Sequence, residues 1–184
     1  RLTRGEERVT IRIMLADDHK MIRDGLKALI GKQKDMEVIG EAADGQTAVR
    51  TARKILPDVV VMDIGMPELN GIEAARQISA LPHKPKVIGL SMHSDRRYVS
   101  QMLKAGASGY LLKDNAFEEL VRAIAIVMKG QTYLSPDIAE TVVDDYRRIK
   151  TKDDGSVFAL LTEREREVLQ QIAEGCSTKE IAGG

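Results

Sequence analysis

Five apolar runs, each followed by an amphipathic stretch, occupy most of the chain between residues 11 and 130. We expect the runs to form strands at 11–16, 37–43, 59–62, 87–90 and 109–112. After the first run, Ile22, Leu26 and Leu29 recur at helical spacing, and the four later stretches repeat this pattern. Strands that alternate with helices predict an α/β fold, in which helices cover both faces of a parallel, doubly wound sheet through right-handed crossovers.

The pattern changes after residue 130. Ser135-Pro136 is a strong helix start, and a short helix is expected to continue to Ile149. The polar stretch 150–156 has the composition of a linker. Two capping boxes then predict helices that begin near Thr162 and Ser177. We therefore divide the chain into a first domain at 10–130, a linker with a short helix at 131–157, and an all-α unit at 158–184.

Composition excludes several classes of protein. The single cysteine, Cys176, cannot form an internal disulfide or a cysteine-rich zinc site. No apolar stretch is long enough to span a membrane, and the polar residues 1–10 do not resemble a signal peptide, so a cytoplasmic location is expected. With 28 basic and 28 acidic residues the formal net charge is zero, which gives no bulk attraction to nucleic acid.

Polar side chains follow four of the five expected strands. They are Asp17 and Asp18 after the first strand, Asp63 after the third, Ser91 after the fourth and Lys113 after the fifth. Parallel strands present their carboxyl ends at one edge of the sheet, where ligands bind, so these groups are expected to converge. Clustered carboxylates repel one another unless a cation offsets them, and oxygen ligands favour Mg²⁺. A single aspartate here could instead be a helix cap, but the whole set is hard to explain in that way.

Several segments closely resemble the receiver domain of two-component response regulators, and in particular the NarL/FixJ subfamily. They are Leu15-Ala-Asp-Asp-His19, Val61-Met-Asp-Ile-Gly-Met-Pro67, Asn70-Gly71 and Gly106-Ala-Ser-Gly-Tyr-Leu-Leu-Lys-Asp114. This resemblance implies a flavodoxin-like five-stranded sheet of order 2-1-3-4-5. The segment from Thr162 to Gly175 resembles the opening helix of a LuxR-type helix-turn-helix domain.

The resemblance also implies roles for individual residues. Asp63 would be the phosphoacceptor for a sensor histidine kinase, and Lys113 would bind the phosphoryl oxygens. Mg²⁺ would be held by Asp17, Asp18, Asp63 and the backbone carbonyl of Gly65. Ser91 and Tyr110 would form the switch, in which Tyr110 turns inward as Ser91 moves toward the phosphoryl group. Asp114 stands where many receivers have proline, so the isomer of the Lys113–Asp114 bond stays open.

The family resemblance further implies that phosphorylation promotes a homodimer and controls DNA binding. The recognition helix of a LuxR-type domain would follow residue 184, and residues 161–184 carry three basic against five acidic side chains. We therefore expect tight DNA binding to require the complete output domain, and weak or no DNA binding by this chain. The dimer surface is left open between the helix near residues 117–128 with its continuation and the helix near residues 20–30.

Three other interpretations fit the sequence less well. A haloacid-dehalogenase-type phosphatase also uses a strand-end aspartate, but it has a second aspartate where Gly65 stands. A receiver that works only through protein contacts would lack the segment that resembles a helix-turn-helix. A metal site built on His19, His83 and His93 lacks ligand spacing, so loop or surface positions are expected for them.

Overall fold

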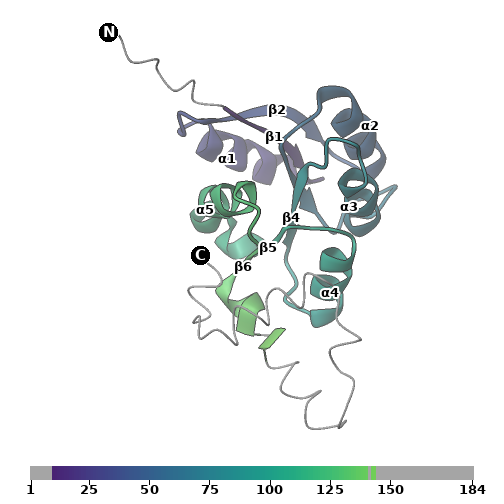
Figure 1. The fold of residues 1–184 in the computed structure, drawn as a ribbon, viewed down its shortest axis with the longest axis vertical. Coiled ribbons are helices and arrows are strands. Elements are labelled where there is room, and N and C mark those ends of the chain that lie inside the picture. The colour runs from purple at the N-terminus through teal and green to yellow at the C-terminus, as the bar shows by residue number, and fades with distance from the viewer. Residues whose placement is uncertain (1–9, 141, 144–184) are drawn as a thin grey trace.

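The computed structural model describes residues 10–140 and 142–143. Six parallel strands form one sheet in the order β2-β1-β3-β4-β5-β6 (Figure 1). The strands are β1 (Ile11–Ala16), β2 (Met36–Ala42), β3 (Val59–Asp63), β4 (Lys86–Ser91), β5 (Gly109–Leu112) and β6 (Tyr133–Leu134). The predicted order 2-1-3-4-5 is therefore confirmed, and a sixth strand extends the sheet beyond the five that were predicted.

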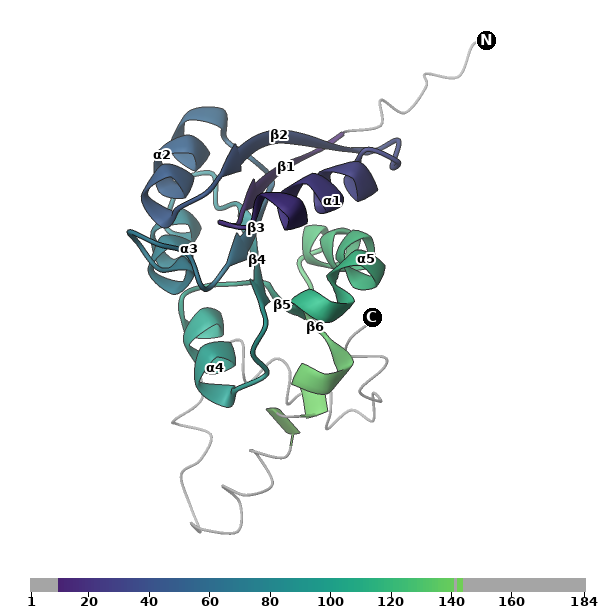
Figure 2. The same cartoon turned by 180° about the vertical axis from the view of Figure 1, so that it is seen from behind.

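Helices cover both faces of the sheet. They are α1 (Lys20–Ile30), α2 (Gly45–Ile55), α3 (Gly71–Ser79), α4 (Arg96–Lys104) and α5 (Ala116–Met128), with a short 3₁₀ turn η1 (Lys113–Asn115) before α5. Helices α1 and α5 lie on one face, and α2, α3 and α4 lie on the other (Figures 1 and 2). This layering is the doubly wound arrangement expected from the alternation of strands and helices.

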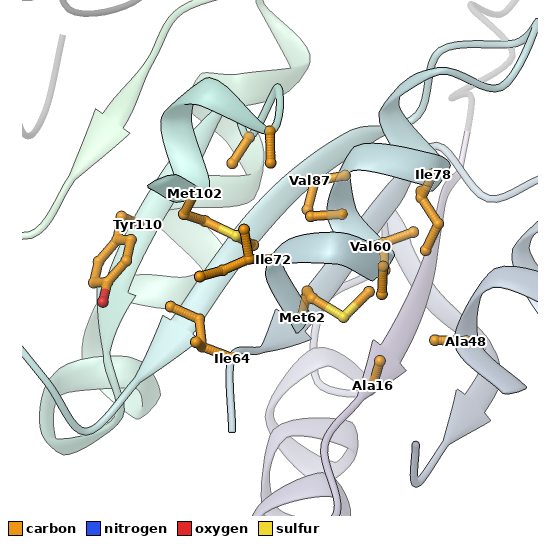
Figure 3. Packing of buried hydrophobic residues seen from close by; sticks show 14 of the residues in the cluster. Ala16, Ala48, Val60, Met62, Ile64, Ile72, Ile78, Val87, Met102 and Tyr110 are labelled. Atoms are coloured by element: carbon orange, nitrogen blue, oxygen red, sulfur yellow. The ribbon is translucent and has the colours of Figure 1, made fainter. Parts of the chain in front are cut away.

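Two apolar cores result, one on each face. Residues of β3 alternate between them: Val59 and Val61 face α1 and α5, whereas Val60 and Met62 face the opposite helices. All five residues of β3 are buried, which explains why this strand reads as a continuous β-branched run. Figure 3 shows the second core, in which Met62 packs with Ile72 and Ile78 of α3.

The predicted elements match the structure closely as far as it describes the chain. Residues 136–140 and 142–143 are helical, as the Ser135-Pro136 signal indicates. The rest of that helix, the linker at 150–156 and the helices expected from Thr162 and Ser177 lie outside the described residues. Within the described part of the chain, no helix is long and apolar enough to cross a membrane.

Candidate functional site

Two aspartates lie side by side where β1 and β3 end. The register pairs Ala16 of β1 with Met62 of β3, so the next residues along the chain, Asp17 and Asp63, emerge together at one edge of the sheet. Both side chains are buried, with 2% and 3% of the residue exposed. Burying two carboxylates this close together is unfavourable unless cations compensate them.

Lys113 supplies one compensating charge. It follows β5 directly, and its Nζ lies 2.8 Å from Asp17 Oδ2 and 2.9 Å from Asp63 Oδ2. Although burial alone would lower the pKa of Lys113, its ion pairs with both carboxylates raise it. The ammonium therefore stays charged, and one cation is shared between two carboxylates.

Asp63 remains in an unfavourable environment for a charge. Burial is the main reason that its pKa is raised, and the neighbouring Asp17 raises it further. The Lys113 ammonium and the Gly65 N–H, which donates to Asp63 Oδ1 at 3.2 Å, oppose this shift without cancelling it. The charged carboxylate of Asp63 is thus stabilised more than that of an ordinary surface aspartate by any added positive charge.

The acidic groups are arranged to hold a cation. Asp17, Asp18, His19 and Asp63 each offer a ligand atom within 4.8 Å of the others. Asp17 Oδ2 is buried and meets the Lys113 ammonium as an ion pair, without a well-aligned hydrogen bond in the described structure, so it retains free lone pairs. Carboxylate oxygens with unused lone pairs fit a hard divalent cation.

His19 belongs to this group, which its sequence position did not indicate. It is the N-cap residue of α1, and its Nδ1 lies 3.1 Å from Asp17 Oδ1 and 2.8 Å from Asp18 Oδ1. The side chain is 63% exposed, so it lies on the rim and not inside the site. His83 lines a separate hollow at the opposite end of the sheet, and His93 lies in the loop after β4.

A cleft of about 450 Å³ opens beside Asp63 and Lys113. Its walls include Ser91 from the end of β4, Met66 from the loop after β3, and Tyr98 from α4. The His93 ring stacks on Tyr98 with the centroids 5.4 Å apart, and both residues face the cleft. The cleft gives a small polar group direct access to Asp63.

Ser91 and Tyr110 are joined through the backbone of His93. Ser91 Oγ accepts a hydrogen bond from His93 N at 3.0 Å, and the Tyr110 hydroxyl donates to His93 O at 2.9 Å. Tyr110 is fully buried, and this burial raises the pKa of its hydroxyl to about 12. The tyrosine therefore occupies the inward position in this structure, as Figure 3 shows for its ring at the edge of the core.

The loop after Asp63 depends on a close backbone contact. A Cβ added to Gly71 would lie 1.9 Å from the carbonyl oxygen of Asp63, so no larger residue fits. Asn70 caps α3 by accepting a hydrogen bond from Glu73 N at 2.9 Å. Helix α3 thus begins directly against the backbone of Asp63 and fixes it.

The Lys113–Asp114 bond is trans, since no cis peptide bond occurs in the described residues.

Comparison with known proteins agrees with this architecture. Residues 13–125 match the response regulator receiver domain, and residues 159–184 match the bacterial regulatory proteins of the luxR family. The chain is 42% identical to the transcriptional regulatory protein LiaR of Bacillus subtilis, covering 93% of this chain and 80% of that protein. It is 37% identical to the response regulator UvrY of Escherichia coli, covering 94% and 78% respectively.

Solved structures show the same fold. A LuxR-family response regulator from Aurantimonas aligns with a TM-score of 0.71 and 39% identity, covering 74% of this chain and 98% of that one. The receiver domain of a NarL regulator from Mycobacterium tuberculosis aligns with a TM-score of 0.63 and 33% identity, covering 66% and 98%. The chain therefore belongs to the two-component response regulators that join a receiver domain to a LuxR-type DNA-binding domain and regulate transcription.

Proposed function

We propose that Asp63 accepts a phosphoryl group from the phosphohistidine of a sensor kinase. The observation that carries this is the pairing of a buried carboxylate of raised pKa with a shared ammonium at the wall of an open cleft. An aspartate with a purely structural role would have hydrogen-bond donors or a cation that it does not share with another carboxylate. Asp63 instead shares its cation with Asp17, and it lines an open cleft from which a phosphoryl donor can reach it.

The transfer is a substitution at phosphorus. An oxygen of Asp63 attacks, the phosphorus–nitrogen bond of the donor breaks, and the histidine nitrogen takes the bonding electron pair. The product is an acyl phosphate on Asp63. Lys113 is 2.9 Å from the attacking carboxylate and is positioned to bind an oxygen of the transferred group. Because the surrounding groups are already in place, positioning and charge neutralisation supply most of the acceleration.

The donor set fits Mg²⁺. Asp17, Asp18, Asp63 and the backbone carbonyl of Gly65 would hold it. When bound, the ion would neutralise charge on the phosphoryl oxygens. We expect His19 to turn away from Asp17 and Asp18 then, since its ring nitrogen contacts oxygens of both.

We also propose that Ser91 and Tyr110 form the switch. The Ser91 hydroxyl would turn toward the phosphoryl group, and the inward Tyr110 would be stabilised by the space this leaves. Their shared contact with His93 supports this coupling, because a movement of Ser91 changes the loop that accepts the Tyr110 hydrogen bond. Phosphorylation would then strongly favour the inward orientation that the Tyr110 side chain has in this structure.

We further propose where the protein acts, how it assembles and how its domains are divided. The protein would act in the cytoplasm, catalyse only its own phosphorylation and dephosphorylation, and form a homodimer when phosphorylated. Its receiver would span 10–130, with a linker at 131–157 and a helix-turn-helix segment at 158–184. We expect the 184-residue chain to bind DNA weakly or not at all, because residues 161–184 carry more acidic than basic side chains.

Incubation with acetyl phosphate and Mg²⁺ tests the central step. Intact-mass measurement should show one added phosphoryl group on the wild-type protein and none on Asp63→Asn, whereas Asp58→Asn should behave as wild type. Equal uptake by wild type and Asp63→Asn would overturn the assignment.

A gel shift with a promoter fragment tests the expected weak or absent DNA binding. Tight, sequence-specific binding by this chain would contradict that expectation.

A further inference from the structure

Six of the residues between 132 and 139, a few positions after the end of α5, are buried as deeply as the core of the sheet. Thr132 is 4% exposed and Tyr133 is 2% exposed, while Leu134, Ser135, Ile138 and Ala139 are fully buried. A tether between two domains is normally exposed and polar. This segment is therefore packed onto the receiver and cannot be a free connection.

Backbone hydrogen bonds pair the segment with the strand that carries Tyr110. Strand β6 runs parallel to β5, with Leu134 opposite Tyr110. Tyr133 N donates to Ser108 O at 3.1 Å, and Ser135 N donates to Tyr110 O at 3.0 Å. The backbone of the proposed switch residue is thus bonded directly to the segment that leads out of the receiver.

Glu119 of α5 fastens the segment from the side. Its Oε2 accepts hydrogen bonds from Ser135 Oγ at 2.6 Å and from the Tyr133 hydroxyl at 3.2 Å. Ser135 Oγ in turn accepts from Leu112 N at 3.4 Å, beside Lys113. A continuous path of hydrogen bonds therefore joins the end of β5, the segment and α5.

Apolar contacts join the same parts. Leu134, Ile138 and Ala139 belong to the core that contains Tyr110 and Met102, and Val142 packs against its margin. Figure 3 shows Met102 of α4 close to the Tyr110 ring. A change in the packing of Tyr110 thus acts on the side chains of the segment as well as on its backbone.

We infer that the edge of β5 is a docking site for residues 132–140 of the chain itself, fastened by Glu119, and that phosphorylation of Asp63 acts on the luxR-family region through this segment. This inference rests on the proposed function. Phosphorylation alters the Ser91–His93–Tyr110 group, the altered β5 edge changes how firmly the segment docks, and the segment continues toward residues 159–184. Glu119 is a positioning residue in this scheme, because it touches neither Asp63 nor the phosphoryl group.

Hydrogen exchange of the whole 184-residue protein tests the docking. The amides of residues 133–139 should exchange at least tenfold faster in Glu119→Ala than in the wild type. In Glu119→Gln their exchange rates should lie between those of the wild type and those of Glu119→Ala. Glu118→Ala, at the exposed neighbouring position of α5, should leave them unchanged. If Glu119→Ala fails to fold, Glu119→Gln and Ser135→Ala give the same comparison. Unchanged exchange at 133–139 in the Glu119 variants would overturn the inference.

Beryllofluoride with Mg²⁺ tests the transmission. Exchange at 133–139 should change at least threefold in wild type. In Glu119→Gln, beryllofluoride should still change the exchange of the amides at 63–66, but it should change the exchange at 133–139 less than in the wild type. A wild-type response at 63–66 without one at 133–139 would overturn this inference alone. No response anywhere in wild type would instead overturn the proposed function, and the transmission with it.

Discussion

The two ends of β3 carry aspartates in opposite situations. At the start, Asp58 Oδ2 accepts a hydrogen bond from Arg12 N at 2.8 Å, and the Arg12 guanidinium binds the carbonyl oxygens of Leu56 and Ile55. At the other end, Asp63 and Asp17 share one ammonium, and burial keeps the pKa of Asp63 raised. The first carboxylate has a dedicated donor, and the second competes for its cation.

This difference separates a structural carboxylate from one that is ready to react. Asp58 helps to hold β1 and β3 in register, and its side chain is only partly buried. Helix α3 and Lys113 hold Asp63 in place, but burial makes the charged form of its carboxylate unfavourable. The electrostatic free energy of the folded protein is therefore higher at this cleft than at Asp58. Substitution of the two aspartates by asparagine should therefore change the unfolding free energy in opposite directions.

Lys113→Met should have the largest effect on stability. It leaves two buried carboxylates without their shared cation, and breaking such an arrangement costs about 3 kcal/mol of unfolding free energy. Arg12→Met at the other end removes exposed hydrogen bonds to carbonyls, with an expected cost of about 1 kcal/mol. Urea unfolding measures both, and equal losses would contradict the distinction between the two ends.

Gly71→Ala should rank second. The added methyl would meet the backbone carbonyl of Asp63, which cannot move without shifting β3, so we expect a loss of about 2 kcal/mol. Gly65→Ala is the matched control, since its Cβ would approach nothing closer than 3.9 Å, and its effect should stay within about 0.5 kcal/mol. Thermal or urea unfolding of the two variants decides whether the close contact fixes the loop.

Asp63→Asn should stabilise the protein at pH 7, by about 1 kcal/mol, because it removes a costly buried charge. Asp58→Asn should instead lower the unfolding free energy by about 0.5 kcal/mol, since an amide oxygen accepts the Arg12 N–H less strongly than a carboxylate does. Destabilisation by Asp63→Asn, measured in the same urea series, would show that Asp63 is as well satisfied as Asp58.

The gain from Asp63→Asn should also depend on pH. The pKa of Asp63 is raised in the folded protein above its ordinary value of 3.8, so the folded state binds this proton more readily than the unfolded state. The contribution of Asp63 to stability therefore falls as pH rises through that window. Asparagine does not titrate, so the difference between variant and wild type should be present at pH 7 and shrink as the pH falls toward 4.

His19→Ala should have the smallest effect. Its exposed imidazole contacts one oxygen of Asp17 and one of Asp18, and losing an exposed pair of this kind changes free energies by about 0.5 kcal/mol. We expect calorimetry to show Mg²⁺ binding about twofold tighter than in wild type, with His83→Ala unchanged. Weaker Mg²⁺ binding by His19→Ala would mean that the imidazole helps to hold the ion.

The sequence predicts the convergence of the site because topology dictates it. Once β1 and β3 are adjacent and parallel, Asp17 and Asp63 must emerge together, and a lysine after β5 lies within reach. Other features have no such signal. Strand β6 has only two residues, which is too short for the alternation of apolar and polar residues that predicts a strand. Its position is supported by tertiary contacts with Glu119. The contact of His19 with the carboxylates depends on a side-chain orientation that spacing cannot indicate.

Identifying the phosphorylated residue tests the central claim most directly. Borohydride reduces an aspartyl phosphate to homoserine, so treatment after acetyl phosphate and Mg²⁺, followed by peptide mass spectrometry, marks the acceptor. We predict homoserine at position 63 alone and none at Asp17, Asp18 or Asp58. Homoserine at another aspartate, with none at position 63, would contradict the account.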